Sequence, residues 1–212
     1  MKRLNILIFI LLTAFSITAQ VGREMYRPFF HYSPSYNWMN DPNGLVYYNG
    51  KYHLFYQYNP LGSTWGNMSW GHAVSTDLIN WEEKSVAIPM QNGIMAFSGS
   101  VIVDWNNTSG FGINGKPPLI AIYTGSGNVQ DQRIAYSNDE GLTWTNYSGN
   151  PVITSNNKQF RDPKVFWHEE TRKWIMAVGL GFNNMIGIYK SPDLKQWTFS
   201  DAFGMKENIS GF

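Results

Sequence analysis

Two Asp-Pro dipeptides are the residues of this chain whose types and spacing suggest chemistry. Asp41 begins one of them, in the stretch Asp-Pro-Asn-Gly, and Asp162 begins the other. Proline and the Asn-Gly pair predict a turn over residues 41–44. Two carboxylates that face one pocket can break a glycosidic bond. The two aspartates have this chemistry only if the fold brings their side chains together.

A repeat in the sequence predicts the elements that would do so. Short β-rich runs separated by Gly, Asn, Pro and Ser form three similar units at intervals of roughly sixty residues, each with three strands, a Ser-x-Asp hairpin and a fourth strand marked by a tryptophan. Such units predict the blades of an all-β propeller, because radial stacking buries the faces of each sheet. We expect blades at approximately 36–89, 90–155 and 156–212. A β-sandwich is the alternative architecture.

Aligned on this repeat, Asp41, Ser98 and Asp162 occupy the same position in three successive blades, on the first strand, which normally lines the central channel. Arg161 precedes Asp162, and neighbours on a regular strand point to opposite faces. Both can therefore face the channel only if the strand begins or kinks there. In that geometry the Arg161 guanidinium would keep Asp162 ionised.

The Ser-x-Asp hairpins themselves need no functional role. Each aspartate can hydrogen-bond the backbone of its own turn, and the tryptophan that follows can pack between blades. We therefore interpret Asp77, Asp139 and Asp193 as structural residues.

Composition narrows the class of partner. The net charge is +1 and only 15% of residues are charged, which argues against nucleic acid. Aromatic residues make up 16% of the chain, and aromatic rings suit the apolar faces of neutral sugars. The chain has no cysteine, and no second ligand lies at metal-binding spacing from His72. We therefore interpret His72 as a structural hydrogen-bonding residue. We predict no metal and no cofactor.

The first residues have the pattern of a secretory signal peptide. Lys2 and Arg3 precede an apolar run over residues 4–12, and small residues follow as far as Ala19. The run is too short to span a membrane. We expect cleavage after residues 1–19 and a secreted or periplasmic protein that has no membrane segment after cleavage.

Five ordered motifs carry a family resemblance: WMNDPNG, FYQYNP, WGNMSWGHA, FSGS and RDP. With these motifs the chain resembles glycoside hydrolase family 32, the β-fructofuranosidases. The resemblance implies a five-bladed β-propeller, of which this chain holds about the first three blades, that hydrolyses fructosides with retention of configuration. It implies Asp41 as the nucleophile and Asp162 as the transition-state stabiliser. It further implies that the following residues bind substrate: Trp38, Asn40, Gln57, Trp65, Phe97, Ser98 and Arg161.

One element of the family pattern is missing. The family's general acid is a glutamate in a Glu-Cys motif, and blade spacing predicts it beyond Phe212; Glu207 is followed by no cysteine and is not assigned this role. The chain therefore resembles part of a longer enzyme, and an inactive fructan-binding protein is one alternative. An arabinanase-like propeller and, less well matched, a sialidase are others. The choice among sucrose, fructo-oligosaccharide and fructan, hydrolysis or fructosyl transfer, and the oligomeric state stay open.

Overall fold

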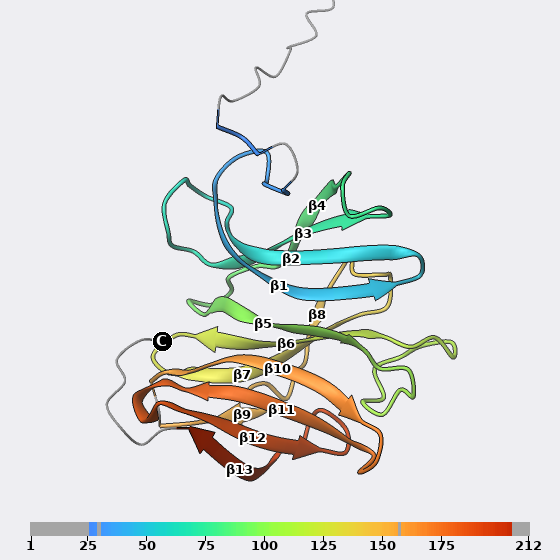
Figure 1. Cartoon of the computed structure of the whole chain (residues 1–212), viewed down its shortest axis with the longest axis vertical. Coiled ribbons are helices and arrows are strands. Elements are labelled where there is room, and N and C mark those ends of the chain that lie inside the picture. Colours follow the sequence, from blue (N-terminus) through green and yellow to red (C-terminus); the bar gives the residue numbers. More distant parts are fainter. Residues whose placement is uncertain (1–25, 29–30, 157, 205–212) are drawn as a thin grey trace, which may run out of the picture.

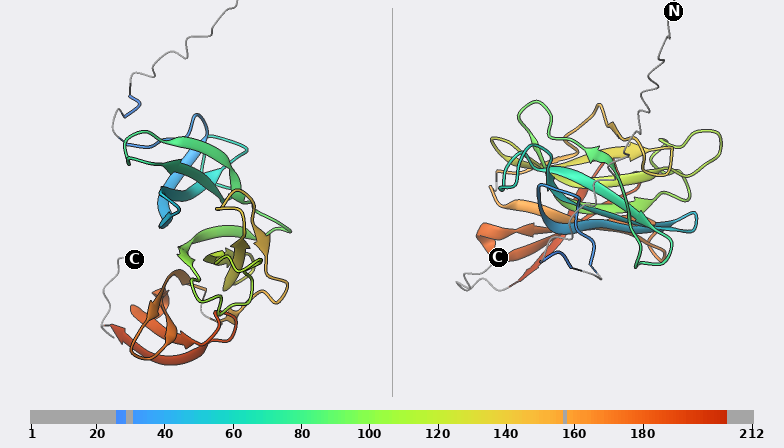
Figure 2. Two further views of the ribbon diagram at one scale, coloured as in Figure 1. Left: turned by 90° about the vertical axis from the view of Figure 1, so that its right-hand side faces the viewer. Right: turned by 90° about the horizontal axis from the view of Figure 1, so that it is seen from above.

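The computed structural model describes residues 26–28, 31–156 and 158–204, and these residues form three antiparallel sheets in chain order. Figures 1 and 2 show the sheets fanned about a common axis like consecutive blades. The predicted all-β architecture with three blades is confirmed. The predicted signal peptide, residues 1–19, lies outside the described residues. In the described part of the chain, no helix is long and apolar enough to cross a membrane.

The first sheet has the order β1-β2-β3-β4. A two-residue turn at Asn49 and Gly50 joins its first two strands; both residues have positive φ, 48° and 78°, as the Asn-Gly hairpin turn requires. The strands are β1 (Trp38–Tyr48), β2 (Lys51–Asn59), β3 (Ser69–Ser75) and β4 (Glu82–Ile88).

The second sheet has the order β5-β6-β7-β8, with β9 also paired to β7, and the third has the order β10-β11-β12-β13. Their strands are β5 (Met95–Val103), β6 (Leu119–Ser126), β7 (Gln130–Ser137), β8 (Thr145–Asn146), β9 (Ile153–Thr154), β10 (Phe160–His168), β11 (Lys173–Leu180), β12 (Met185–Ser191) and β13 (Thr198–Gly204). A short 3-10 helix, η1 (Gly181–Asn183), follows β11.

The Ser-x-Asp hairpins have the structural role predicted for them. In the first sheet, Asp77 Oδ1 accepts hydrogen bonds from Ser75 Oγ at 3.0 Å and from the backbone N–H of Asn80 at 2.7 Å, and Trp81 Nε1 donates to Leu78 O. The same pattern of contacts recurs in the other two sheets, around Asp139 with Trp144 and around Asp193 with Trp197.

Apolar side chains fill the spaces between successive sheets. Phe55 and Trp70 pack against Val101 and Tyr123 between the first and second sheets. A second cluster joins the second and third sheets, with Ile120, Ile122, Phe160, Val165 and Met176 among its fully buried or nearly buried members. Burial of apolar surface is the main source of stability, and this packing also brings the first strand of each sheet beside the first strand of the next.

The two outward faces of the fan differ. On the first sheet, Tyr32 packs against Tyr56, with their rings 5.1 Å apart and their hydroxyls 2.8 Å apart. On the third sheet, Phe166, Ile186 and Phe203 are exposed. The chain therefore covers the outer face of its first sheet with its own N-terminal segment.

Candidate active site

The first strands of the three sheets share an irregularity. The pairing register shifts between Asn40 and Pro42 in β1, between Ala96 and Gly99 in β5, and between Arg161 and Lys164 in β10. A β-bulge interrupts the alternation of side chains and re-aims a residue. These three bulges contain Asp41, Ser98 and Asp162, the residues that the repeat aligns.

Asp41 lies within a strand and not at a chain reversal. The turn predicted over residues 41–44 is wrong: β1 continues through this stretch, with a second register shift between Asn43 and Val46. Gly44 has φ of 58°, and a Cβ there would lie 2.8 Å from Phe55 Cδ2. The turn-forming residues therefore form a pair of bulges, and β2 pairs with the residues of β1 before and after them.

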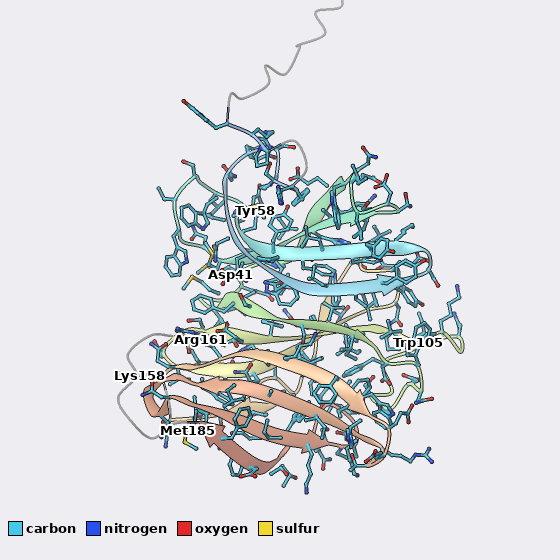
Figure 3. All side chains as sticks on the ribbon, in the orientation of Figure 1. Asp41, Tyr58, Trp105, Lys158, Arg161 and Met185 are labelled. Carbon is cyan, nitrogen blue, oxygen red and sulfur yellow. The ribbon has the colours of Figure 1, made fainter. Side chains whose placement is uncertain are left out.

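Ser98 connects the first two bulges. Its Oγ donates a long hydrogen bond of 3.4 Å to Asp41 Oδ2, and the Asp41 side chain is exposed. A carboxylate with one hydroxyl donor and open access can approach a ligand. Figure 3 shows Asp41 and Arg161 toward the same end of the sheets, whereas Trp105 lies at the other end.

Asp162 has an unusual backbone. Its φ is 64°, in the left-handed region, and its backbone N–H donates to Thr124 Oγ1 at 3.1 Å. The Nε atom of Arg161 lies 3.4 Å from Asp162 Oδ2. The bulge therefore allows these sequence neighbours to approach each other, whereas a regular strand would point them to opposite faces.

The electrostatic surroundings of Asp162 act in opposing directions. Loss of solvent around the carboxylate raises the pKa of Asp162, the Arg161 guanidinium lowers it, and the charge of Asp41 raises it; the net direction is upward. Arg161 thus acts in the predicted direction but does not dominate. Because 57% of the Asp162 side chain is exposed, solvent screens part of each interaction. The contribution of Asp41 indicates that the two carboxylates influence one another.

The predicted substrate-binding residues differ in exposure. Trp38 Nε1 donates to Asn40 Oδ1 at 2.7 Å, beside the first bulge. Trp65 is 55% exposed, and its ring centre lies 6.2 Å from that of Phe97 in an edge-to-face arrangement. Gln57 is only 3% exposed, and its Nε2 donates to Ala96 O at 3.0 Å. The side-chain amide of Gln57 therefore anchors β5.

Two anchoring contacts escaped the sequence analysis. Trp70 is fully buried, and its Nε1 donates to Phe97 O at 2.9 Å, within the second bulge. Thr124, which holds the backbone of Asp162, was not singled out. No local signal points to either contact, because each partner is a backbone atom on the next sheet.

A hollow of about 680 Å³ lies on the outer face of the third sheet. Its walls are mainly apolar, with Val178, Leu180 and Phe203 among them, and Arg161 and Asp162 are the only predicted site residues that line it. Asp41 does not. The hollow is therefore not centred on the two carboxylates, but it reaches one of them. Among the described residues, no group of three or more His, Cys, Asp or Glu could hold a metal ion.

Known proteins with similar sequences match most of this chain. The family model described as the glycosyl hydrolases family 32 N-terminal domain matches residues 31–212. A levanase from Bacillus subtilis (strain 168) is 56% identical over 191 residues, which are 89% of this chain and 28% of that protein. An extracellular exo-inulinase from Aspergillus awamori is 49% identical over 209 residues, covering 85% of this chain and 39% of that protein.

A solved structure is also similar. The β-fructofuranosidase from Schwanniomyces occidentalis complexed with fructosyl-erythritol superposes with a TM-score of 0.81 at 45% identity, over 84% of this chain and 36% of that one. The chain thus spans between 28% and 39% of the length of these curated relatives.

Proposed function

This chain belongs to glycosyl hydrolase family 32, and from that membership we propose that the full-length protein hydrolyses terminal β-D-fructofuranosyl residues of sucrose or fructans, with retention of configuration. The complete catalytic domain is proposed to be a five-bladed propeller. The relatives include a levanase and an exo-inulinase, which supports a fructose polymer or oligomer as substrate. The partner is then a neutral sugar.

The observation that carries this proposal is the pair of bulges that contain Asp41 and Asp162. In the proposed mechanism Asp41 attacks the anomeric C2 of the fructosyl unit, and the bond from C2 to the leaving oxygen breaks. A glutamate outside the described residues protonates that oxygen. Water, deprotonated by the same glutamate, then attacks C2, and fructose leaves as Asp41 is regenerated.

The surrounding residues fit supporting roles in this mechanism. Asp162 accepts hydrogen bonds from fructose hydroxyls as positive charge develops on the ring, and Arg161 beside it donates to the sugar. Ser98 donates to Asp41, and the exposed ring of Trp65 against Phe97 offers an apolar wall for a sugar face. The remaining members of the proposed fructose site are Trp38, Asn40 and Gln57.

Export of the protein is part of the proposal. A signal peptide over residues 1–19 would direct it to the periplasm or the medium, where polymeric fructans are accessible. The exo-inulinase relative is extracellular, which supports this location.

The test is the Asp41→Asn variant of the full-length protein, with fructose release from sucrose and from inulin as the measurement. Loss of the nucleophile should lower kcat by about 10⁴-fold or more, while calorimetry still detects binding of a fructo-oligosaccharide. NMR of the first product should give the β-anomer. Unchanged release in the variant, or inversion at C2, would contradict the mechanism. A wild-type protein that binds the sugar but releases no fructose would support the fructan-binding alternative.

A further inference from the structure

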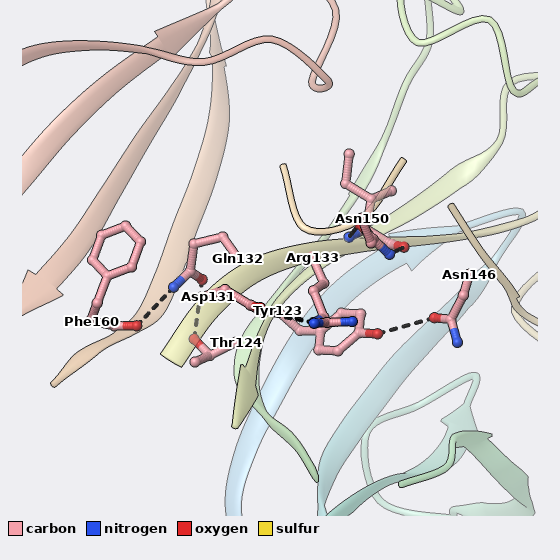
Figure 4. Close-up of polar contacts among 9 residues, drawn as sticks. Tyr123, Thr124, Asp131, Gln132, Arg133, Asn146, Asn150 and Phe160 are labelled. Atoms are coloured by element: carbon pink, nitrogen blue, oxygen red, sulfur yellow. Dashed lines mark hydrogen bonds and ion pairs between the residues drawn. The ribbon is translucent and has the colours of Figure 1, made fainter. Parts of the chain in front are cut away.

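We propose that Thr124 and Gln132, on the second sheet, are positioning residues for Asp162 and Arg161 on the third. This inference rests on the proposed function, because it concerns the geometry of the same site. Figure 4 shows two of the contacts, from Thr124 on β6 to Gln132 on β7 and from Gln132 to the backbone carbonyl of Phe160 on β10. The third contact joins Thr124 to the backbone N–H of Asp162 on β10.

Three hydrogen bonds form a continuous path. The backbone N–H of Asp162 donates to Thr124 Oγ1 at 3.1 Å, and the hydroxyl of Thr124 donates to Gln132 Oε1 at 3.1 Å. Gln132 Nε2 then donates to the backbone carbonyl of Phe160 at 2.9 Å. Thr124 and Gln132 are both fully buried, so water cannot replace a lost partner without rearrangement.

The two ends of this path enclose one residue. Phe160 and Asp162 are the neighbours of Arg161, and the path holds the carbonyl before Arg161 and the N–H after it. The held segment ends where the bulge begins, at Asp162, whose φ is 64°. The left-handed conformation is unfavourable for a non-glycine residue by itself, and the residue keeps it only when contacts with the surrounding structure hold the backbone there. Thr124 and Gln132 provide such contacts at Asp162 N and Phe160 O.

The first sheet has a related contact. Gln57 Nε2 donates to Ala96 O, and Ala96 precedes Ser98 by two residues, as Phe160 precedes Asp162. A buried glutamine amide therefore anchors the next first strand at both inter-sheet boundaries. The hydrogen bond that the backbone N–H of Asp162 donates to Thr124 adds a second anchor in β10, at the start of the bulge and on the candidate catalytic residue itself.

Asp162 lies where the pairing of β10 with β11 is interrupted. Between Arg161 and Lys164 the register with β11 is interrupted, so the regular ladder does not hold the backbone of Asp162. The hydroxyl of Thr124 takes that role from the opposite direction. Loss of this hydroxyl should let the bulge relax and should move the Asp162 carboxylate away from the substrate.

The test compares Thr124→Val with Thr124→Ser and Thr108→Val in the full-length protein. Valine keeps the shape of threonine but cannot accept from Asp162 N or donate to Gln132. Thr108→Val is the matched control, because Trp174 Nε1 donates to Thr108 Oγ1 at 2.7 Å and so also joins the second and third sheets, but it does so elsewhere along them. For each variant, kcat and KM for sucrose are measured together with Tm.

We expect Thr124→Val to lower kcat by about 10- to 100-fold with a smaller change in KM, since a displacement of about 1 Å at a reacting group can cost 10²-fold. Thr124→Ser should return kcat to within about threefold of the wild type. Thr108→Val should lower Tm to a similar extent and leave kcat within about twofold. If the folded Thr124→Val and Thr108→Val proteins have equal kcat, Thr124 has only a structural role.

Two further measurements keep the inference testable. Should Thr124→Val not fold, Gln132→Met removes the bond to Phe160 and leaves the bond from Asp162 to Thr124, and an unchanged kcat in that variant overturns the proposal. A crystal structure of either variant reports the backbone of Asp162 without any need for activity; an unmoved bulge with φ near 64° also overturns it. A wild-type protein that releases no fructose refutes the proposed function, while the structural comparison still decides whether the path positions Asp162.

Discussion

His53 Nδ1 lies 3.0 Å from His72 Nε2 in a buried pair between the first and second sheets. The two rings are stacked, and His72 also stacks on Phe55 with centroids 4.3 Å apart. A Cβ added to Gly141 would lie 3.4 Å from His72 Cε1, so a turn of the second sheet packs against this pair. His72 was predicted to be a structural hydrogen-bonding residue, and this contact confirms it.

The surroundings of this histidine pair favour the neutral form of both imidazoles. Burial, then the neighbouring His53 and Lys84, lower the pKa of His72 to about 3. Burial and Lys51 lower the pKa of His53, and Glu140 opposes them. In an unfolded chain histidine titrates near pH 6.5. Below about pH 6.5 the unfolded chain therefore binds protons that the folded chain does not bind, and the free energy of unfolding falls as the pH falls toward the folded pKa values.

The first prediction is a loss of stability in mild acid. We expect the contribution of this pair to the free energy of unfolding to be about 1 to 3 kcal/mol smaller at pH 5.5 than at pH 7.5. The double variant His53→Gln/His72→Gln should flatten this dependence even if it is less stable overall. Urea unfolding of the full-length protein at the two pH values measures it. A double variant with the same pH dependence as the wild type would contradict the prediction.

The second prediction concerns the pKa of Asp162, which Arg161 and Asp41 move in opposite directions. Replacing Arg161 with Met removes a positive neighbour and should raise the pKa of Asp162 further. Replacing Asp41 with Asn removes a negative neighbour and should lower it. An NMR titration that follows the side-chain carboxyl carbon of Asp162 in the three proteins measures both shifts. Movement in the same direction in both variants would show that the surrounding solvent, and not these charges, controls the group.

The propeller-like sheets could be predicted because their signals are local. Each Ser-x-Asp hairpin satisfies its own turn within a few residues, as Asp77 does with Ser75 and Asn80, and alternating apolar residues define the strands on either side. The equivalence of Asp41 and Asp162 follows from the same repeat.

The details of the site depend on contacts between strands and between sheets, and they could not be predicted. Residues 41–44 have the composition of a turn. Because the residues before and after this stretch pair with β2, it forms bulges within β1 instead. Gln57 has a polar side chain suited to a sugar, yet its Nε2 donates to a carbonyl on the second sheet. Thr124 holds a backbone N–H of the third sheet. A backbone partner on another sheet leaves no mark in the local sequence.

The third prediction concerns Gly44 in the first bulge. Alanine there would have φ near 58° and would place its Cβ 2.8 Å from Phe55 and 2.9 Å from Val101. Backbone strain and overpacking together should lower the free energy of unfolding by about 2 to 4 kcal/mol. Gly50→Ala is a matched control, because Gly50 also has positive φ but has no neighbouring atoms within 4 Å; it should lose about 1 kcal/mol. Equal losses in urea unfolding would mean that close packing at Gly44 contributes nothing.

The fourth prediction separates the two roles of Trp70. Its ring fills the space between the first two sheets, and its Nε1 holds the carbonyl of Phe97 beside Ser98. Trp70→Phe keeps an aromatic ring but leaves that half-buried carbonyl without its donor, which should lower the free energy of unfolding by about 1 to 3 kcal/mol. The change in the bulge should also lower kcat for fructose release, because Ser98 would no longer be held beside Asp41.

Trp174→Phe is the control for that variant. Trp174 is also buried, and its Nε1 also donates across a boundary between sheets, to Thr108 Oγ1, without touching a predicted site residue. It should therefore lose a similar free energy of unfolding in urea while its kcat stays near that of the wild type. If both variants lose stability and neither loses kcat, Trp70 supports the sheet but not the site, and the bulge at Phe97 is held by the strand pairing of β5 with β6 alone.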